Sequence, residues 1–284
     1  GAGLVVKLRA EPLVQPLDVG NLLHDLHADG GAEKLRLGLV LALELYDPCR
    51  LASLIGQESE LRDKARDGAH KLKNAGVAVD EIDLIVVGTL TPDNTTPSVA
   101  AKISNIIGTR AGIPTFDVAA ACSGFVYALT MADNMVRLGQ VKTALVIGAE
   151  TLSKVVDWTD RNTCVLFGDG AGAVVIRAKE GNGTADDAGI LSTRLYSDGA
   201  QYNNLYISGG VSTTGKAGFI VMNGKEVFKS AVGSLSEAAE AVMNDAGVTI
   251  DSVDWLLPHQ ANIRIIEGVG HKLGIAPEKV IVTV

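Results

Sequence analysis

The sequence is poor in aromatic residues and in cysteine. Phe, Trp and Tyr make up 4% of the 284 residues, and the three cysteines are Cys49, Cys122 and Cys164, with no CxxC pair among them. An odd number of widely spaced cysteines argues against a disulfide framework or a zinc site and is typical of proteins from a reducing compartment. We therefore expect a cytoplasmic protein that holds no metal ion.

Long apolar runs and a strong positive charge are also lacking. No stretch of 18 or more apolar residues occurs, which argues against a transmembrane helix. The opening segment GAGLVVKLRA has no charged start and no cleavage site, so secretion is not indicated. The net charge of −8 argues against general nucleic-acid binding, although it leaves room for a local basic patch.

An alternation of helix and strand patterns begins near residue 60 and indicates an α/β architecture. The continuous apolar run IDLIVVGTL (82–90) is typical of a strand buried on both faces. The spacing of apolar residues predicts helices over 58–76, 97–108 and 123–139, and strands over 114–118, 143–150 and 171–178. Strands that alternate with helices in this order predict a layered fold around a largely parallel sheet.

The sequence also contains an internal repeat. AGVAVDEIDLIVVG (75–88) and AGVTIDSVDWLLPH (246–259) match at Ala, Gly, Val, Asp and Asp at a constant offset of 171. Each copy lies between two helix patterns, and a strand pattern follows, PTFDV in the first copy and KVIVTV in the second. We interpret this as a duplication, with one half over residues 61–180 and a second over 186–284. Residues 1–60 form a separate segment that matches neither half.

Cys122 lies in DVAAACSGFVYAL (117–129), where a strand pattern passes into a helix pattern. A thiol at a helix N-terminus faces unpaired N–H groups and the positive end of the dipole, which predicts a lowered pKa and a reactive thiolate. The same N–H groups can stabilise the oxyanion of a thioester under attack. The alternative is a small buried residue at a tight junction, the interpretation that we give to Cys49 and Cys164.

His259 lies in LLPHQANIRI (256–265), where Pro258 ends a predicted strand and the His-Gln-Ala-Asn run opens the next helix. On a helix, Asn262 falls on the same face three residues later, so both side chains are expected in one cavity. Chemistry in open α/β sheets collects at the carboxyl ends of the strands. The duplication therefore predicts one pocket for Cys122 and His259, although they lie 137 positions apart.

The glycines of FGDGAGAVVI (167–176) invite a dinucleotide-binding interpretation. Such glycines must follow a strand and open a helix, whereas β-branched, strand-like residues follow here. We therefore predict that the segment enters a strand and binds no nucleotide.

Four segments together resemble β-ketoacyl-acyl-carrier-protein synthase III of the thiolase superfamily: DVAAACSGFVYAL, DWTDRNTCVLFGDGAGA, NGKEVFKSAV and DWLLPHQANIRI. The resemblance covers roughly residues 60 to 284. It implies a thiolase-like αβαβα layered fold made of two duplicated halves, usually in a homodimer. It also implies an acyltransferase of fatty-acid biosynthesis that joins an acyl-CoA primer, with acetyl-CoA expected, to malonyl-acyl-carrier protein.

The resemblance assigns the chemistry to two residues. Cys122 is expected to accept the acyl group from CoA, and His259 to support decarboxylation of the malonyl thioester by hydrogen bonding to the developing enolate oxygen. This chemistry needs a thiolate, an oxyanion hole and a neutral hydrogen-bond donor, so no cofactor is expected. Two other functions stay open, an inactive thiolase-fold binding or dimerisation partner and a related CoA-dependent acyltransferase.

Further residues match binding positions of the family. Arg161 resembles an arginine that contacts CoA, Gly224 and Phe228 fall where the pantetheine tunnel is lined, and Asn262 belongs to the His259 motif. Thr96 stands where the family has an aromatic residue near the primer pocket, so a primer longer than acetyl is a further hypothesis. A basic surface for the acidic carrier protein is expected at Lys229, Arg264 and Lys272, with a solvated helix face as the alternative for Lys272.

The sequence departs from the family at both ends. The segments that supply a tryptophan and an arginine to the CoA adenine are not found in the first 60 residues, and the tryptophans are Trp158 and Trp255. The Gly-Asn-Thr turn that carries the asparagine partner of the histidine is expected after the last residues, VIVTV. We therefore expect the second half to be incomplete.

Overall fold

The computed structural model describes residues 2–7, 39–40, 77–187 and 189–284. The described residues divide into two compact units. The first, which we call the Cys122 unit, contains the described residues of Val6–Glu150 together with Gly170–Leu191. The second, the His259 unit, contains residues 2–5, Thr151–Asp169 and Ser192–Val284. The helix expected over 58–76 and the residue Cys49 lie outside the described residues.

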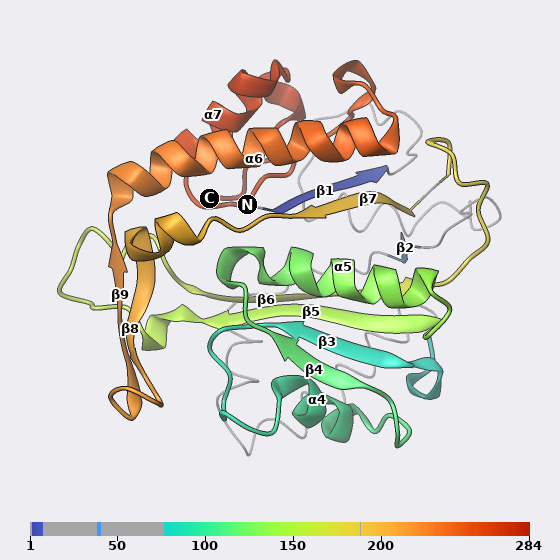
Figure 1. Cartoon of the computed structure of the whole chain (residues 1–284), viewed down its shortest axis with the longest axis horizontal. Helices are drawn as coiled ribbons and strands as arrows, with labels where there is room; N and C mark the ends of the chain where they lie inside the picture. The colour runs from blue at the N-terminus through green and yellow to red at the C-terminus, as the bar shows by residue number, and fades with distance from the viewer. Residues whose placement is uncertain (1, 8–38, 41–76, 188) are drawn as a thin grey trace. The chain divides into compact units, whose positions relative to one another are not determined.

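A five-stranded sheet organises the Cys122 unit (Figure 1). Its strand order is β2-β6-β5-β3-β4, and β3 pairs in parallel with both β4 and β5. The strands expected from the sequence are confirmed, with bounds Leu84–Gly88 for β3, Thr115–Val118 for β4, Thr143–Thr151 for β5 and Asp169–Arg177 for β6; the short β2, Leu39–Val40, pairs antiparallel with β6.

Strand β3 forms the centre of the core, and all five of its residues are buried. Ile85 and Val87 pack with Leu145 and Ile147 of β5 and with Val99 at the start of helix α4 (Val99–Ile107). Helix α5 (Gly124–Arg137) also packs on β3, and Figure 1 draws α4 and α5 against opposite sides of the sheet. Burial on both faces accounts for the uninterrupted apolar run in the sequence.

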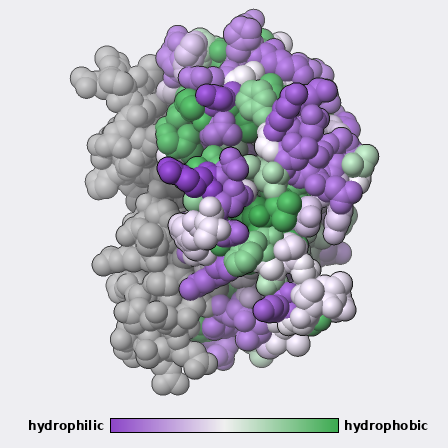
Figure 2. All heavy atoms as spheres, turned by 90° about the vertical axis from the view of Figure 1, so that its left-hand side faces the viewer, coloured by the Kyte–Doolittle hydropathy of each residue, from purple (hydrophilic) through white to green (hydrophobic). Residues whose placement is uncertain are grey.

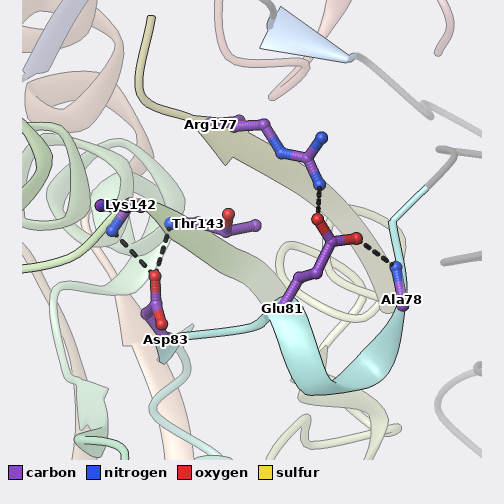
Figure 3. Close-up of polar contacts among 6 residues, drawn as sticks. All are labelled: Ala78, Glu81, Asp83, Lys142, Thr143 and Arg177. Atoms are coloured by element: carbon purple, nitrogen blue, oxygen red, sulfur yellow. Dashed lines mark hydrogen bonds and ion pairs between the residues drawn. The ribbon is translucent and has the colours of Figure 1, made fainter.

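Polar contacts fix the edge of the sheet at which β3 and β5 begin (Figure 3). Asp83 accepts hydrogen bonds from the backbone N–H groups of Lys142 (2.9 Å) and Thr143 (3.1 Å) and pairs with Arg110. Burial opposes ionisation of Asp83, but these hydrogen bonds together hold the pKa of its carboxyl below the ordinary value. At the same edge, Glu81 accepts a hydrogen bond from Arg177 at the end of β6 (2.8 Å).

The His259 unit is built from a β-hairpin and two packed helices. Strands β8 (Leu205–Gly210) and β9 (Lys216–Met222) pair antiparallel, and helices α6 (Gly224–Ala246) and α7 (Ile263–Leu273) follow. The helices approach closely at Gly268, where an added Cβ would lie 3.2 Å from a methyl group of Val232. A smaller sheet pairs β1 (Ala2–Lys7) with β7 (Gly189–Leu195). None of the described helices is long and apolar enough to cross a membrane.

The internal repeat reappears in the structure. A 3-10 turn lies at Val79–Glu81 (η1) in the first copy and at Ile250–Ser252 (η5) in the second, at the same offset of 171. Ile85 pairs in parallel with β4, and its counterpart Leu256 forms a parallel bridge to Val280.

The strand expected to end at Pro258 and the strand expected over 279–284 are wrong in extent. In the described residues, the two segments share one bridge, in which Leu256 donates to the Lys279 carbonyl (2.8 Å) and accepts from the Ile281 N–H (2.9 Å). A strand requires a ladder of several such pairs, and the pairing here extends no further.

Candidate active site

Cys122 occupies a sharp turn between a strand and a helix of the Cys122 unit. Strand β4 ends at Val118, a 3-10 turn covers Ala121–Ser123, and α5 begins at Gly124. Cys122 is exposed, and Ala121, directly before it, has a φ of +47°. A non-glycine residue adopts this left-handed region at a cost and persists there when its surroundings enforce it. The strained turn thus presents the sulfur at the surface of the unit.

The small residues around Cys122 have a packing reason that the sequence did not reveal. A Cβ on Gly88, the last residue of β3, would lie 2.6 Å from the Gly124 carbonyl oxygen and 2.8 Å from the Phe125 N. The end of β3 and the start of α5 therefore touch backbone to backbone. This contact sets the direction in which α5 leaves the turn, and with it the position of Cys122.

The expectation that the pKa of Cys122 is lowered is wrong for this structure. Desolvation by the surrounding protein raises the pKa of the thiol, its own backbone hydrogen bond lowers it, and the negative charge of Glu150 raises it further. Although Cys122 is exposed at its surface, the protein packed around the turn restricts hydration of a thiolate. The thiol form is therefore favoured in the resting structure.

Glu150 is a residue of this site that the sequence analysis missed. It lies near the carboxyl end of β5, and its carboxylate accepts hydrogen bonds from the Leu90 N–H (2.9 Å) and the Thr91 hydroxyl (2.6 Å). Burial raises the pKa of Glu150, while these hydrogen bonds lower it. The available signal in the sequence was an acidic residue at the end of an otherwise apolar strand.

Thr96 belongs to the same unit as Cys122. It is exposed in the loop that joins β3 to α4, and α4 begins with Ser98 as its N-cap, whose hydroxyl accepts from the Ala101 N–H (3.1 Å). Because β3 and β4 are neighbouring parallel strands, this loop and the Cys122 turn follow the same edge of the sheet. A contact of Thr96 with substrate stays a prediction.

His259 lies in the connection between the Leu256 bridge and α7. The neighbouring Gln260 fixes this connection: its amide donates to the carbonyls of Pro258 (2.9 Å) and Ile281 (3.2 Å) and accepts from the Thr283 N–H (2.8 Å). His259 is exposed at its surface, but the protein packed around it restricts hydration of an imidazolium, so desolvation lowers the pKa of His259 and favours the neutral imidazole. A neutral imidazole carries one N–H donor, as the expected role requires.

The expectation that His259 and Asn262 share a helix face is wrong. Helix α7 begins at Ile263, so the His-Gln-Ala-Asn run precedes it. Asn262 is the N-cap of α7, and its side-chain oxygen accepts a hydrogen bond from the Ile265 N–H (3.1 Å). Asparagine is a preferred N-cap residue, so capping accounts for this position. A substrate contact of Asn262 stays a prediction.

Arg161 lies in an ordered loop of the His259 unit. The carboxylate of Asp157 accepts from the Thr159 N–H (2.9 Å), and that of Asp160 accepts from the Asn162 N–H (3.0 Å). These side chains fold the loop into two tight turns, and Arg161 is exposed between them.

The remaining expected residues lie on the two helices of the His259 unit. Gly224 opens α6, and Phe228 and Lys229 follow one turn later, all three exposed. Arg264 and Lys272 are exposed on α7, which packs against α6. The structure thus brings the expected basic residues onto two packed helices.

The expected site residues divide between the two units. Cys122 and Thr96 belong to the Cys122 unit, and all the others belong to the His259 unit. A common pocket for Cys122 and His259 stays a prediction. The FGDGAGAVVI segment enters β6, as expected, and opens no helix. In the described part of the chain, no three His, Cys, Asp or Glu side chains are grouped so that they could hold a metal ion.

Comparisons with known proteins give a consistent result. The profile of 3-oxoacyl-[acyl-carrier-protein (ACP)] synthase III matches residues 116–199, and the profile of its C-terminal region matches residues 243–284. The chain is 56% identical to β-ketoacyl-[acyl-carrier-protein] synthase III of Rhizobium rhizogenes over 213 residues, which is 75% of this chain and 66% of that protein. It is 54% identical to the Rhodospirillum centenum protein of the same name over 226 residues, 80% of this chain and 69% of that protein.

A solved structure extends the similarity to the fold. The crystal structure of 3-oxoacyl-[acyl-carrier-protein] synthase III from Aquifex aeolicus matches with a TM-score of 0.71 and 43% identity, over 81% of this chain and 70% of that chain. The expected thiolase-like fold is thereby confirmed. The match spans about two thirds of the length of these curated relatives.

Proposed function

This chain belongs to the 3-oxoacyl-[acyl-carrier-protein] synthase III family, and from that membership we propose that it joins an acyl-CoA primer to malonyl-acyl-carrier protein. The observation that carries the proposal is the position of Cys122 in an exposed, strained turn between β4 and α5. The product is a 3-oxoacyl-acyl-carrier protein, the first condensation product of fatty-acid biosynthesis. The relatives are named as synthases, which favours this function over a non-catalytic one.

In the first step, the sulfur of Cys122 attacks the thioester carbonyl of the acyl-CoA. The carbon–sulfur bond to CoA breaks, CoA leaves as its thiol with the proton from Cys122, and an acyl-cysteine thioester forms. The first N–H groups of α5 point toward the turn and can hydrogen bond the oxyanion of this step. Acetyl-CoA is the primer that we propose.

In the second step, the malonyl thioester loses carbon dioxide, and the electron pair of the broken bond moves into an enolate. His259 donates a hydrogen bond to the enolate oxygen, a role supported by the desolvation that lowers its pKa and favours neutral imidazole. The enolate carbon then attacks the acyl-cysteine carbonyl, a carbon–carbon bond forms, and the Cys122 thiolate leaves. No metal ion or redox cofactor takes part in these steps.

We assign substrate binding to residues of both units. Arg161, Gly224, Phe228 and Asn262 contact the CoA or pantetheine part, and Thr96 borders the acyl chain. Lys229, Arg264 and Lys272 form the docking surface for the acidic carrier protein, since exposed cations on packed helices can steer an anionic partner to the site despite the negative charge of the chain.

We further propose that the enzyme is a cytoplasmic homodimer. Strand β4 is an edge strand of the described sheet, and its four residues are half-buried. The β8–β9 hairpin also carries exposed apolar side chains, among them Phe219 (52% exposed), and Figure 2 shows apolar patches on the face to which this hairpin belongs. An open strand edge and exposed apolar side chains both favour association with a second copy.

The condensation itself tests the proposal. The 284-residue chain is incubated with acetyl-CoA and malonyl-acyl-carrier protein, and the carrier protein is analysed by mass spectrometry. We expect acetoacetyl-acyl-carrier protein from the wild type, none from Cys122→Ala, and at least a hundredfold less from His259→Ala. Acetyl transfer to another acceptor without a 3-oxo product would instead identify a simple acyltransferase.

A further inference from the structure

Glu150 is a partly buried carboxylate that the proposed chemistry does not use. It receives hydrogen bonds from three consecutive residues of one loop: the Thr89 hydroxyl (3.4 Å), the Leu90 N–H (2.9 Å) and the Thr91 hydroxyl (2.6 Å). The Thr91 N–H also donates to the Thr89 hydroxyl (3.2 Å), which closes the loop on itself. One carboxylate thus holds the whole start of the segment that follows β3.

This loop is linked to the turn that carries Cys122. The Thr89 N–H donates to the carbonyl of Val118 (3.1 Å), the last residue of β4 before the turn. Gly88, directly before the loop, touches Gly124, directly after the turn. The loop held by Glu150 therefore contacts the turn that carries Cys122 where β4 ends. Gly88, directly before the loop, contacts the same turn where α5 begins.

We propose that Glu150 is a positioning residue of the Cys122 site: its carboxylate fixes the Thr89–Thr91 loop against the turn that carries Cys122, and its negative charge disfavours the Cys122 thiolate. This inference rests on the proposed role of Cys122 as the nucleophile. Without this charge, the Cys122 thiol should ionise more readily in the resting enzyme. The raised pKa of the Cys122 thiol, to which burial and then Glu150 contribute, agrees with this role.

Within the Cys122 unit, Glu150 is the main charged group that acts on the turn. Strand β3 carries no titratable side chain, and the first two turns of α5 carry Tyr127 alone. Asp117 on β4 is engaged by the first N–H groups of α4, at Val99 (2.7 Å) and Ala100 (2.9 Å). In the β3–α4 loop, Asp93 forms an ion pair with Lys102 (2.6 Å).

The pH dependence of Cys122 alkylation tests the charge. Glu150→Gln keeps groups that can hydrogen bond Leu90 and Thr91 but removes the charge. We expect iodoacetamide to alkylate Cys122 roughly two- to fivefold faster in this variant at pH 7, with the midpoint of the rate profile at lower pH. Peptide mass spectrometry separates Cys122 from Cys49 and Cys164. The measurement needs no acyl-CoA, so its result is independent of whether the condensation is observed.

Two control variants separate charge from structure. Thr91→Val removes the 2.6 Å hydrogen bond but leaves the charge, so it should lower the melting temperature and leave the alkylation midpoint unchanged. Glu81→Gln removes a carboxylate at the opposite edge of the sheet and should change neither the alkylation rate nor its midpoint. An alkylation profile of folded Glu150→Gln that equals the wild-type profile would overturn the proposal, as would an equal shift in Thr91→Val.

Hydrogen exchange tests the positioning. Glu150→Ala leaves the Leu90 N–H without its partner, so the peptide that contains residues 89–91 should exchange at least tenfold faster than in the wild type. Unchanged exchange in this peptide would show that the carboxylate does not hold the loop, and the proposal would fail.

Discussion

At the scale of single residues, Ala121 holds the least favourable backbone conformation near the site. Its φ of +47° lies in the left-handed region, and it is the one non-glycine residue there in the described ranges. Such a conformation costs on the order of 1–3 kcal/mol, which the contacts around the turn must offset. The conformation determines the direction of the backbone at Cys122, so the cost is incurred at the residue that we propose as the nucleophile.

A β-branched side chain at this position should be strongly unfavourable. We expect Ala121→Val to lower the free energy of unfolding by roughly 1–2 kcal/mol, because a second branch at Cβ crowds the backbone at positive φ. Urea denaturation measures the loss. Ala119→Val, at an exposed position without a positive φ, is the matched control and should change stability by less than about 0.5 kcal/mol. Equal effects of the two substitutions would contradict the strained turn.

His259 leads to a prediction of pH dependence. Desolvation by the surrounding protein lowers its pKa from the ordinary value of 6.5, so protonation favours the unfolded state and the neutral form persists to lower pH in the folded state. Because the proposed step requires neutral His259, the condensation rate should fall at acidic pH with a midpoint below pH 6.5. NMR titration of the imidazole, assigned through His259→Asn with His271→Gln as the control, measures the same midpoint. A midpoint above pH 6.5 contradicts the desolvated, neutral imidazole.

At the scale of elements, the contact between β3 and α5 determines where the turn that carries Cys122 lies. Gly88 and Gly124 allow the end of the strand and the start of the helix to touch through their backbones. The local apolar patterns predicted β3, β4, β5 and α5 because each depends on its own sequence. The contact between them was not predictable, since it joins residues from two elements 36 positions apart.

A side chain at Gly88 should therefore disturb both stability and the site. We expect Gly88→Ala to lower the free energy of unfolding by roughly 1–3 kcal/mol, because its Cβ would meet backbone atoms that have no room to shift. Gly172→Ala on β6 is the matched control, since a Cβ there meets nothing within 4 Å, and its effect should stay within about 0.5 kcal/mol. Urea midpoints compare the two variants. A neutral Gly88→Ala would contradict the close backbone contact.

The second copy of the repeat marks the limit of local prediction. The apolar residues of 253–257 and 279–284 have the composition of strands, yet they pair at one bridge in the described structure. Strand formation depends on partners that the local pattern does not contain. His259 and Asn262 illustrate the same limit, because the helix start was expected four residues too early and the capping role of Asn262 was missed.

At the scale of the whole molecule, the open edge of β4 predicts how two copies associate. The Pro114 carbonyl accepts from Ile85 of β3, and the Val118 carbonyl accepts from Thr89 just after β3. The intervening Thr115 and Asp117 therefore direct their backbone groups to the other side. No strand of the described residues pairs with that side. A second copy of β4 offers the same unpaired groups, and the two edges can pair.

A dimer formed in this way should be sensitive to proline at Thr115. We expect Thr115→Pro to weaken dimerisation about tenfold or more, because it removes an outward N–H without changing the ladder to β3. Thr115→Val keeps the N–H and is the matched control. Mass photometry across a dilution series measures both variants. A wild-type chain that stays monomeric at micromolar concentration, or a Thr115→Pro variant that dimerises like the control, would contradict this arrangement.

The acylation of Cys122 tests the central claim most directly. The folded chain is incubated with acetyl-CoA, and its intact mass is measured before and after. We predict an increase of about 42 Da, the mass of an acetyl group that replaces a hydrogen, located on the Cys122 peptide and absent from Cys122→Ala. A folded wild-type chain that gains no acetyl group, or one that gains it equally in the Cys122→Ala variant, would contradict the account.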